Sequence, residues 1–97
     1  MNIDEILENK NVERLIRENP GLYTVDMENN VGIYKMSEAY SAHNTQQFRD
    51  DLGGAIRKIV LYRDSLSPNS PFMKNEIDII NSMLENFCKG ESEIPEI

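Results

Sequence analysis

The sequence predicts an α+β fold that is mainly helical, with a short helical N-terminus, a β-hairpin and then a long antiparallel helix pair. In the second half of the chain, apolar residues recur at alternating spacings of three and four, which is typical of buried helix faces. Residues 22–36 instead alternate apolar and polar side chains around a polar turn, which is typical of a hairpin. A five-residue link at 67–71 joins the two helical segments and implies that they run antiparallel.

The N-terminal segment is predicted to form two short helices rather than one. At 100° per residue, Ile6 and Leu15 would point to opposite sides of a single straight helix. A break at residues 9–11 removes this conflict, and we expect Asn11 to cap the second helix. The Asn-Pro-Gly run at 19–21 should end this unit, because the residue before a proline resists helical geometry.

The predicted hairpin has its turn at residues 28–30. Tyr23 and Val25 alternate with polar neighbours on the first strand, and Val31 and Ile33 resume the apolar pattern on the second. Two strands alone are marginal in water, so the hairpin is expected to lean on the helices.

The first long helix is predicted to start at Asn44, with Gln47 completing a capping arrangement, and to end at the Ser-Pro pair 67–68. Its apolar face steps by four and three residues, which predicts continuous contact with a partner helix. The members of this face are Phe48, Leu52, Ala55, Ile59, Tyr62 and Leu66.

The second long helix is predicted to begin with Ser70 as its cap and Pro71 at its first position. Lys89 and Gly90 supply its stop signal, since glycine readily adopts the left-handed conformation that ends helices. Its apolar face consists of Met73, Ile77, Ile80, Leu84 and Phe87.

Two charged residues fall inside these apolar faces. The antiparallel register brings Arg63 of the first helix close to Glu76 of the second. An acid buried alone would cost several kcal/mol, so we predict a structural ion pair between the two. The alternative is that both side chains reach outward to water.

The adjacent glycines Gly53 and Gly54 are unexpected in the chain's most regular helix, because each costs about 1 kcal/mol in a helix interior. Both point away from the apolar face, close in phase to Arg57 and Leu61. They can mark a bend, receive the hairpin or N-terminal unit of the same chain, or form a surface for a second subunit or target protein. We expect an unbroken helix with a closely packed back face, so all four residues are partner-contact candidates.

Two tyrosines and two tail residues complete the set of partner-contact candidates. Tyr34 and Tyr40 are not tied to a helix face, and tyrosine is favoured at interfaces. The 90–97 tail is by default a solvated end, but we predict that Ile94 or Ile97 packs on the domain or a neighbouring chain.

The composition points away from catalysis and from membranes. The 97 residues are expected to form one domain, without a signal peptide or membrane span. His43 is the only histidine and precedes a predicted helix start, so a loop or capping role is expected. Cys88 is the only cysteine and is predicted to be a structural thiol, which suggests a reducing, cytoplasmic setting. We therefore expect no catalytic residues, no metal and no cofactor.

The net charge of −7 argues against direct binding to a nucleic-acid backbone, which requires a basic surface. The favoured function is a non-enzymatic protein-interaction module: a small acidic regulator, an inhibitor of bacterial or phage type, or an assembly subunit. Its partner is another protein, with a homodimer as one alternative. The runner-up is an acidic nucleic-acid mimic that presents carboxylates to a basic site. A small-molecule or enzymatic domain would need a pocket that the sequence does not reveal.

Overall fold

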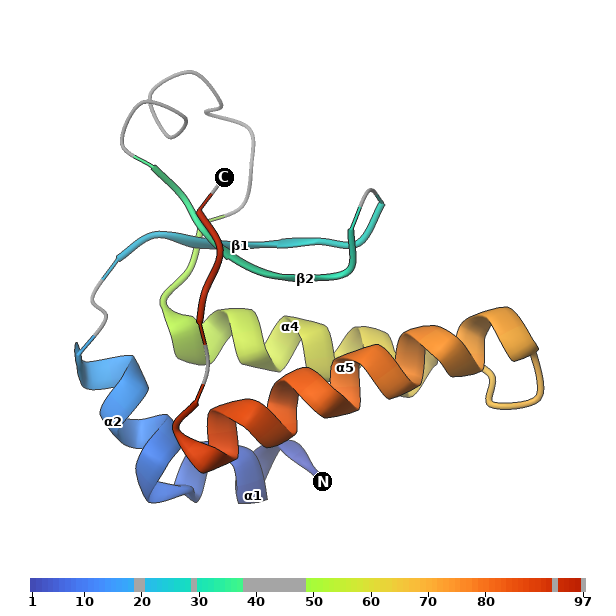
Figure 1. Cartoon of the computed structure of the whole chain (residues 1–97), viewed down its shortest axis with the longest axis horizontal. Helices are drawn as coiled ribbons and strands as arrows, with labels where there is room; N and C mark the ends of the chain where they lie inside the picture. The colour runs from blue at the N-terminus through green and yellow to red at the C-terminus, as the bar shows by residue number, and fades with distance from the viewer. Residues whose placement is uncertain (19–20, 29, 38–48, 92, 97) are drawn as a thin grey trace.

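The computed structural model describes residues 1–18, 21–28, 30–37, 49–91 and 93–96. It confirms the mainly helical α+β fold with a two-stranded hairpin. Figure 1 shows the two long helices side by side, with the hairpin on one side of them and the two short helices on the other. The elements are α1 (Ile3–Glu8), α2 (Lys10–Glu18), β1 (Tyr23–Asp26), β2 (Gly32–Lys35), α4 (Leu52–Ser65) and α5 (Pro71–Lys89).

The N-terminal break occurs where the sequence predicts it, but a different residue caps the second helix. The Asn9 side-chain oxygen accepts hydrogen bonds from the backbone N–H groups of Asn11 (2.9 Å) and Val12 (3.4 Å). The prediction that Asn11 is the cap is therefore wrong. Its side-chain amide instead donates to the carbonyl of Cys88 at 2.8 Å and ties α2 to the end of α5.

The hairpin is antiparallel, and its register runs from Tyr23 opposite Lys35 to Asp26 opposite Gly32. It does not stand alone, because backbone partners extend it on both edges. Tyr23 exchanges backbone hydrogen bonds with Asp50 (3.0 and 3.1 Å), and the Lys35 N–H donates to the carbonyl of Pro95 at 2.8 Å. The expected support is therefore present, and the buried Tyr23 side chain reaches the helical core.

Helix α4 begins at Leu52, which is later than the sequence predicts. Asp50 pairs with β1, and the Asp51 carboxylate then caps the helix by accepting from the Gly54 N–H at 2.6 Å. Residues 49–51 are not helical, so the predicted start at Asn44 is wrong; Asn44 itself, with Gln47 and Phe48, lies outside the described residues. The helix runs unbroken through both glycines, which occupy its first turn rather than its middle.

Helix α5 has the predicted ends. Ser70 occupies the cap position without a side-chain capping bond, and Pro71 is the first helical residue. Gly90 ends the helix with a φ of 74°, a left-handed conformation that suits glycine.

A single cluster of buried side chains joins α1, α2, α4, α5 and the hairpin. Met73 departs from the predicted apolar face, since 39% of its surface is exposed near the turn between the long helices. The cluster comprises Ile6, Val12, Leu15, Tyr23, Ile33, Leu52, Ala55, Ile56, Ile59, Val60, Ile80, Leu84 and Phe87.

Candidate functional site

A groove runs between the hairpin and α5, and we call it the hairpin–α5 groove. Its outer hollow, of about 260 Å³, lies between the hairpin turn and the first half of α5. Its inner hollow, of about 220 Å³, lies between β2 and the second half of α5 and is bounded by the C-terminal tail. Asn30 and Val31 line both hollows, so the two hollows adjoin at these residues.

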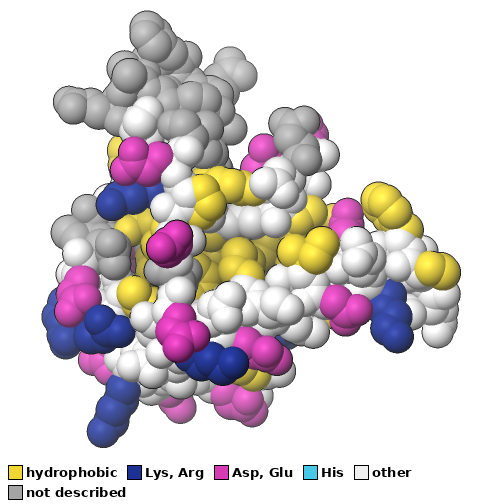
Figure 2. All heavy atoms as spheres, viewed as in Figure 1, with side chains coloured by type: hydrophobic (Ala, Val, Ile, Leu, Met, Phe, Trp, Pro, Cys, Tyr) yellow, Lys and Arg dark blue, Asp and Glu magenta, His cyan; other side chains and the backbone are white. Residues whose placement is uncertain are grey.

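Helix geometry gives α5 a second apolar face toward this groove. Phe72, Ile79 and Met83 follow one another at spacings of seven and four, so they lie along one side of the helix. Phe72 is 74% exposed and Ile79 is 48% exposed. Figure 2 shows hydrophobic side chains gathered in the space between the hairpin and α5. Exposed apolar groups collected beside polar ones are typical of interaction sites.

The hairpin supplies the opposite wall. Met27 (38% exposed) and Val31 lie at its turn, and Ile33 forms part of the floor of the inner hollow. Tyr34 also lines the inner hollow, and its hydroxyl donates to the Asn30 carbonyl at 2.7 Å. This tyrosine is the sequence-predicted candidate that does lie in the groove.

The ionisable groups that line the groove are acidic. Glu28 and Glu76 line the outer hollow and Glu93 lines the inner one, whereas neither hollow has a lysine or arginine among its described lining residues. The groove therefore combines an apolar floor with a negative rim, which complements a segment that carries apolar and basic side chains.

Glu76 is held by a tyrosine rather than by the predicted arginine. The Tyr62 hydroxyl donates to Glu76 Oε2 at 2.6 Å. This hydrogen bond is the largest cause that raises the pKa of Tyr62, and burial and the Glu76 charge act in the same direction. The predicted Arg63–Glu76 ion pair is absent from the described contacts, because Tyr62 lies about 100° from Arg63 on the helix and takes the position facing Glu76.

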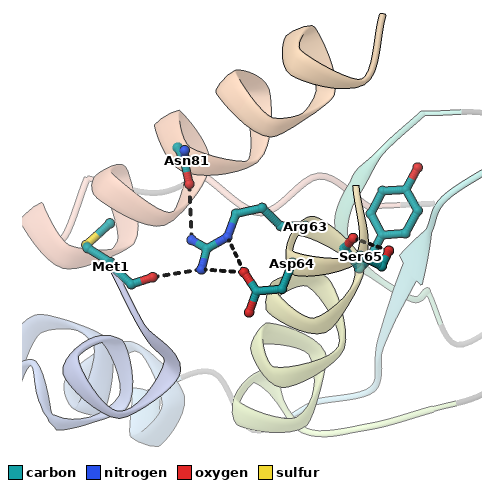
Figure 3. A network of polar contacts seen from close by, with 6 residues as sticks. Met1, Arg63, Asp64, Ser65 and Asn81 are labelled. Atoms are coloured by element: carbon teal, nitrogen blue, oxygen red, sulfur yellow. Dashed lines mark hydrogen bonds and ion pairs between the residues drawn. The ribbon is translucent and has the colours of Figure 1, made fainter. Parts of the chain in front are cut away.

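Arg63 instead joins three parts of the fold, as Figure 3 shows. Its guanidinium donates to Asn81 Oδ1 of α5 at 3.1 Å and to the Met1 carbonyl at 2.7 Å. It also forms an ion pair with Asp64 at 3.1 Å. Its side chain is only 10% exposed, so the role of Arg63 is structural.

The predicted contact surface on α4 lies outside the groove. A Cβ atom on Gly53 would meet Ile16 of α2 at 3.6 Å, and one on Gly54 would meet the Asp50 carboxylate at 2.6 Å. The glycines are therefore covered by the same chain, in line with the close packing expected. The back face is not covered throughout as predicted, because Leu61 is 70% exposed. Leu61 and Arg57 line a separate hollow of about 230 Å³ beside α1.

The remaining candidates divide between the described and undescribed parts of the chain. Ile94 packs against the core, as predicted. Tyr40 and Ile97, like His43, lie outside the described residues. Cys88 is half-buried with its thiol 3.7 Å from the Met1 sulfur; burial is the main cause that raises its pKa, which the N-terminal charge opposes.

Within the described ranges, no three histidine, cysteine, aspartate or glutamate side chains come together in a way that could hold a metal ion. Of the helices described, none has the length and apolar character needed to cross a bilayer.

Comparison with known proteins gave no match, whether against protein-family models, curated proteins or solved structures. The hairpin–α5 groove is the candidate site that the described residues offer. Sequence reasoning missed this site, although the spacing of Phe72, Ile79 and Met83 was a usable signal for a second apolar face.

Proposed function

We propose that this chain is a non-enzymatic protein-interaction module that binds an apolar, basic segment of another protein in the hairpin–α5 groove. The observation that carries the proposal is the exposure of Phe72, Ile79 and Met27 around one hollow with an acidic rim. Such a module would act as a small regulator or inhibitor, or as one subunit of an assembly, in the cytoplasm.

The groove supports this function through two separate effects. Complete burial of a large apolar side chain contributes about 1.5–3 kcal/mol, so Phe72 and Ile79 are the natural anchors for affinity. Glu28 and Glu76 would mainly orient a basic partner and speed its association, and this contribution should weaken as salt is added.

The acidic nucleic-acid mimic is less well supported by the same groove. A mimic presents closely spaced carboxylates, whereas apolar side chains separate the described acids of the rim. We therefore propose a protein partner. A second copy of the chain is one form this partner could take.

Affinity capture from the source cells tests this proposal when wild type is compared with two variants. Phe72→Asp with Ile79→Asp places charges in the groove, and Leu61→Asp places one on the exposed back of α4 as the matched control. We expect one stoichiometric protein that the groove variant loses and the Leu61 variant retains. Equal capture by all three proteins, or recovery of nucleic acid or small molecules alone, would contradict the proposal.

A further inference from the structure

The hydrogen-bonding pattern of the hairpin fixes which groups of β2 point outward. In an antiparallel pair, residues alternate between bonding the neighbouring strand and facing away from it. The Met36 N–H donates to the carbonyl of Leu22, the residue before β1. The Lys35 N–H instead donates outward, to the carbonyl of Pro95 in the tail. By this alternation, the N–H and C=O groups of Ile33 also face outward, toward the tail edge.

The tail occupies this edge without completing it. Lys35 and Glu96 form a parallel bridge, so the next bond along the ladder would run from the N–H of residue 95 to the carbonyl of Ile33. Residue 95 is a proline and has no N–H to donate. The described part of the chain supplies no hydrogen bond to the outward groups of Ile33.

These outward groups are nevertheless shielded from water. Ile33 is only 2% exposed, and Glu93 and Pro95 of the tail line the inner hollow beside it. A buried backbone group without a partner is costly, because the protein does not replace the bonds that water would make. The described residues of the tail thus cover the edge of β2 and leave the outward N–H and C=O groups of Ile33 without a hydrogen bond from them.

We propose that residues 93–96 of the tail are a displaceable occupant of the β2 edge, and that the partner segment replaces them as an extended strand parallel to β2. This inference rests on the proposed function and specifies how the groove binds. The seated tail shows that the edge accepts a strand, and an occupant with an amide N–H opposite Ile33 gains the bond that Pro95 cannot make.

The groove also defines the side chains of the occupant. Alternate side chains of a strand point to opposite faces, so one set would contact Met83 and Phe87. Glu28 and Glu76 still line the outer hollow after the tail and its Glu93 leave, so basic residues are favoured among the remaining positions where the segment passes the hairpin turn. The expected partner segment is therefore extended, alternates apolar and basic residues, and lacks proline at the pairing position.

The test is an amide NMR titration of the full chain with a capped seven-residue peptide of alternating lysine and valine. We expect the largest shifts at the amides of Ile33 and Lys35. The same peptide with N-methylated lysines cannot donate the amide hydrogens that face β2, because the pairing positions alternate with the apolar positions that face α5. It should bind at least about fivefold more weakly, the effect of losing one hydrogen bond.

Two tail variants separate displacement from simple groove binding. Ile94→Ser removes the packing that holds the tail and should tighten peptide binding about fivefold, whereas Pro95→Ala supplies the missing N–H, strengthens tail docking and should weaken it by a similar factor. If Ile94→Ser unfolds the protein, the Pro95→Ala result decides.

Equal affinities for the two peptides would overturn strand addition. So would an unchanged peptide affinity in the folded tail variants, Ile94→Ser and Pro95→Ala, or in Pro95→Ala alone if Ile94→Ser does not fold. Failure of the lysine–valine peptide to bind either the wild type or the tail variants would overturn it as well. A different result would contradict the proposed function: equal capture of the partner by wild type and by the variant with Phe72→Asp and Ile79→Asp.

Discussion

The adjacent glycines of α4 have different surroundings although both occupy the first turn. Gly53 faces Ile16 at an ordinary contact distance, whereas Gly54 lies directly beneath the Asp50 carboxylate. That carboxylate is held by Lys58 at 2.7 Å, and the Asp50 backbone pairs with β1. A side chain at position 54 would thus displace the Asp50 carboxylate just before α4, whereas one at position 53 would make ordinary contacts.

Alanine substitutions should therefore have different effects at these two positions. Gly53→Ala should raise the free energy of unfolding by about 0.4–1 kcal/mol through the reduced entropy of the unfolded chain. Gly54→Ala should not show this gain, because the new methyl group displaces the Asp50 carboxylate from Lys58 and the lost ion pair, worth about 0–1 kcal/mol, offsets it. Urea denaturation at neutral pH measures both changes.

The Asp50→Ala background is the control for this pair. Without the carboxylate, Gly54→Ala should become stabilising. A gain that is still missing in this background would mean that Asp50 is not the obstacle.

The Tyr62–Glu76 hydrogen bond predicts a specific dependence of stability on pH. The pKa of Tyr62 is raised above the ordinary value of about 10, so the folded state favours the protonated phenol. The stabilisation is fully present below pH 10 and is lost as the pH rises through the folded-state pKa. Because the Tyr62 hydroxyl is close to solvent, Tyr62→Phe should cost only about 0.5–1 kcal/mol at pH 7, and this difference from wild type should shrink above pH 10. A difference that stays constant across that range would contradict this role of the bond.

Among the elements, helix ends that depend on local chemistry were predictable and those that depend on distant contacts were not. Pro71 and Gly90 carry their own conformational preferences and mark the ends of α5 correctly. The start of α4 depends on Asp50 pairing with Tyr23, which lies 27 residues earlier in the chain. Nothing in the spacing of Asn44 and Gln47 could reveal that pairing.

Helix periodicity identified the buried character of Arg63 but not its partner. The guanidinium joins α4 to α5 and to the start of the chain through three different acceptors, two of them backbone or amide oxygens. The prediction chose Glu76 as the partner of Arg63 because it was based only on the pairing of opposite charges. Neutral acceptors carry no comparable sequence signal.

Arg63→Lys should destabilise the fold by about 1–3 kcal/mol, although the charge is kept. A lysine ammonium cannot reproduce the fork of N–H groups that reaches Asn81 and Met1 together. Thermal unfolding measures the effect, with Arg57→Lys on the exposed side of α4 as the matched control. Equal melting temperatures for the two variants would show that the network adds no stability.

At the scale of the whole molecule, the described part of the tail is a structural part of the fold. Ile94 packs on the core, and the Pro95 carbonyl accepts from Lys35. The sequence predicted that Ile94 or Ile97 packs on the domain or a neighbouring chain. It could not predict the edge of β2 as the docking place, since this depends on the hairpin register.

Deletion of residues 91–97 should lower the free energy of unfolding by about 2 kcal/mol, from the lost packing of Ile94 and one backbone hydrogen bond. For a domain of this size the melting temperature should fall by roughly 10 °C. Glu93→Gln, a change at an exposed side chain, is the matched control. An unchanged melting temperature after deletion would show that the tail does not stabilise the domain.

The candidate site follows from the arrangement of the whole chain. The second apolar face of α5 is present in the sequence, but it becomes a groove only because the hairpin lies opposite Phe72 and Ile79. The sequence instead favoured the back of α4, where Gly53 and Gly54 are covered by their own chain. Small residues indicate close packing equally well within one chain and between two.

The most direct test of the central claim is amide hydrogen exchange on the protein alone and in complex with the partner recovered by affinity capture. Binding in the hairpin–α5 groove predicts slower exchange at residues 31–35 of the hairpin and along α5 from Phe72 to Met83. It also predicts unchanged exchange on the exposed side of α4 around Leu61. Slower exchange around Leu61 with an unchanged hairpin would contradict the account and place the partner on the other face of the molecule.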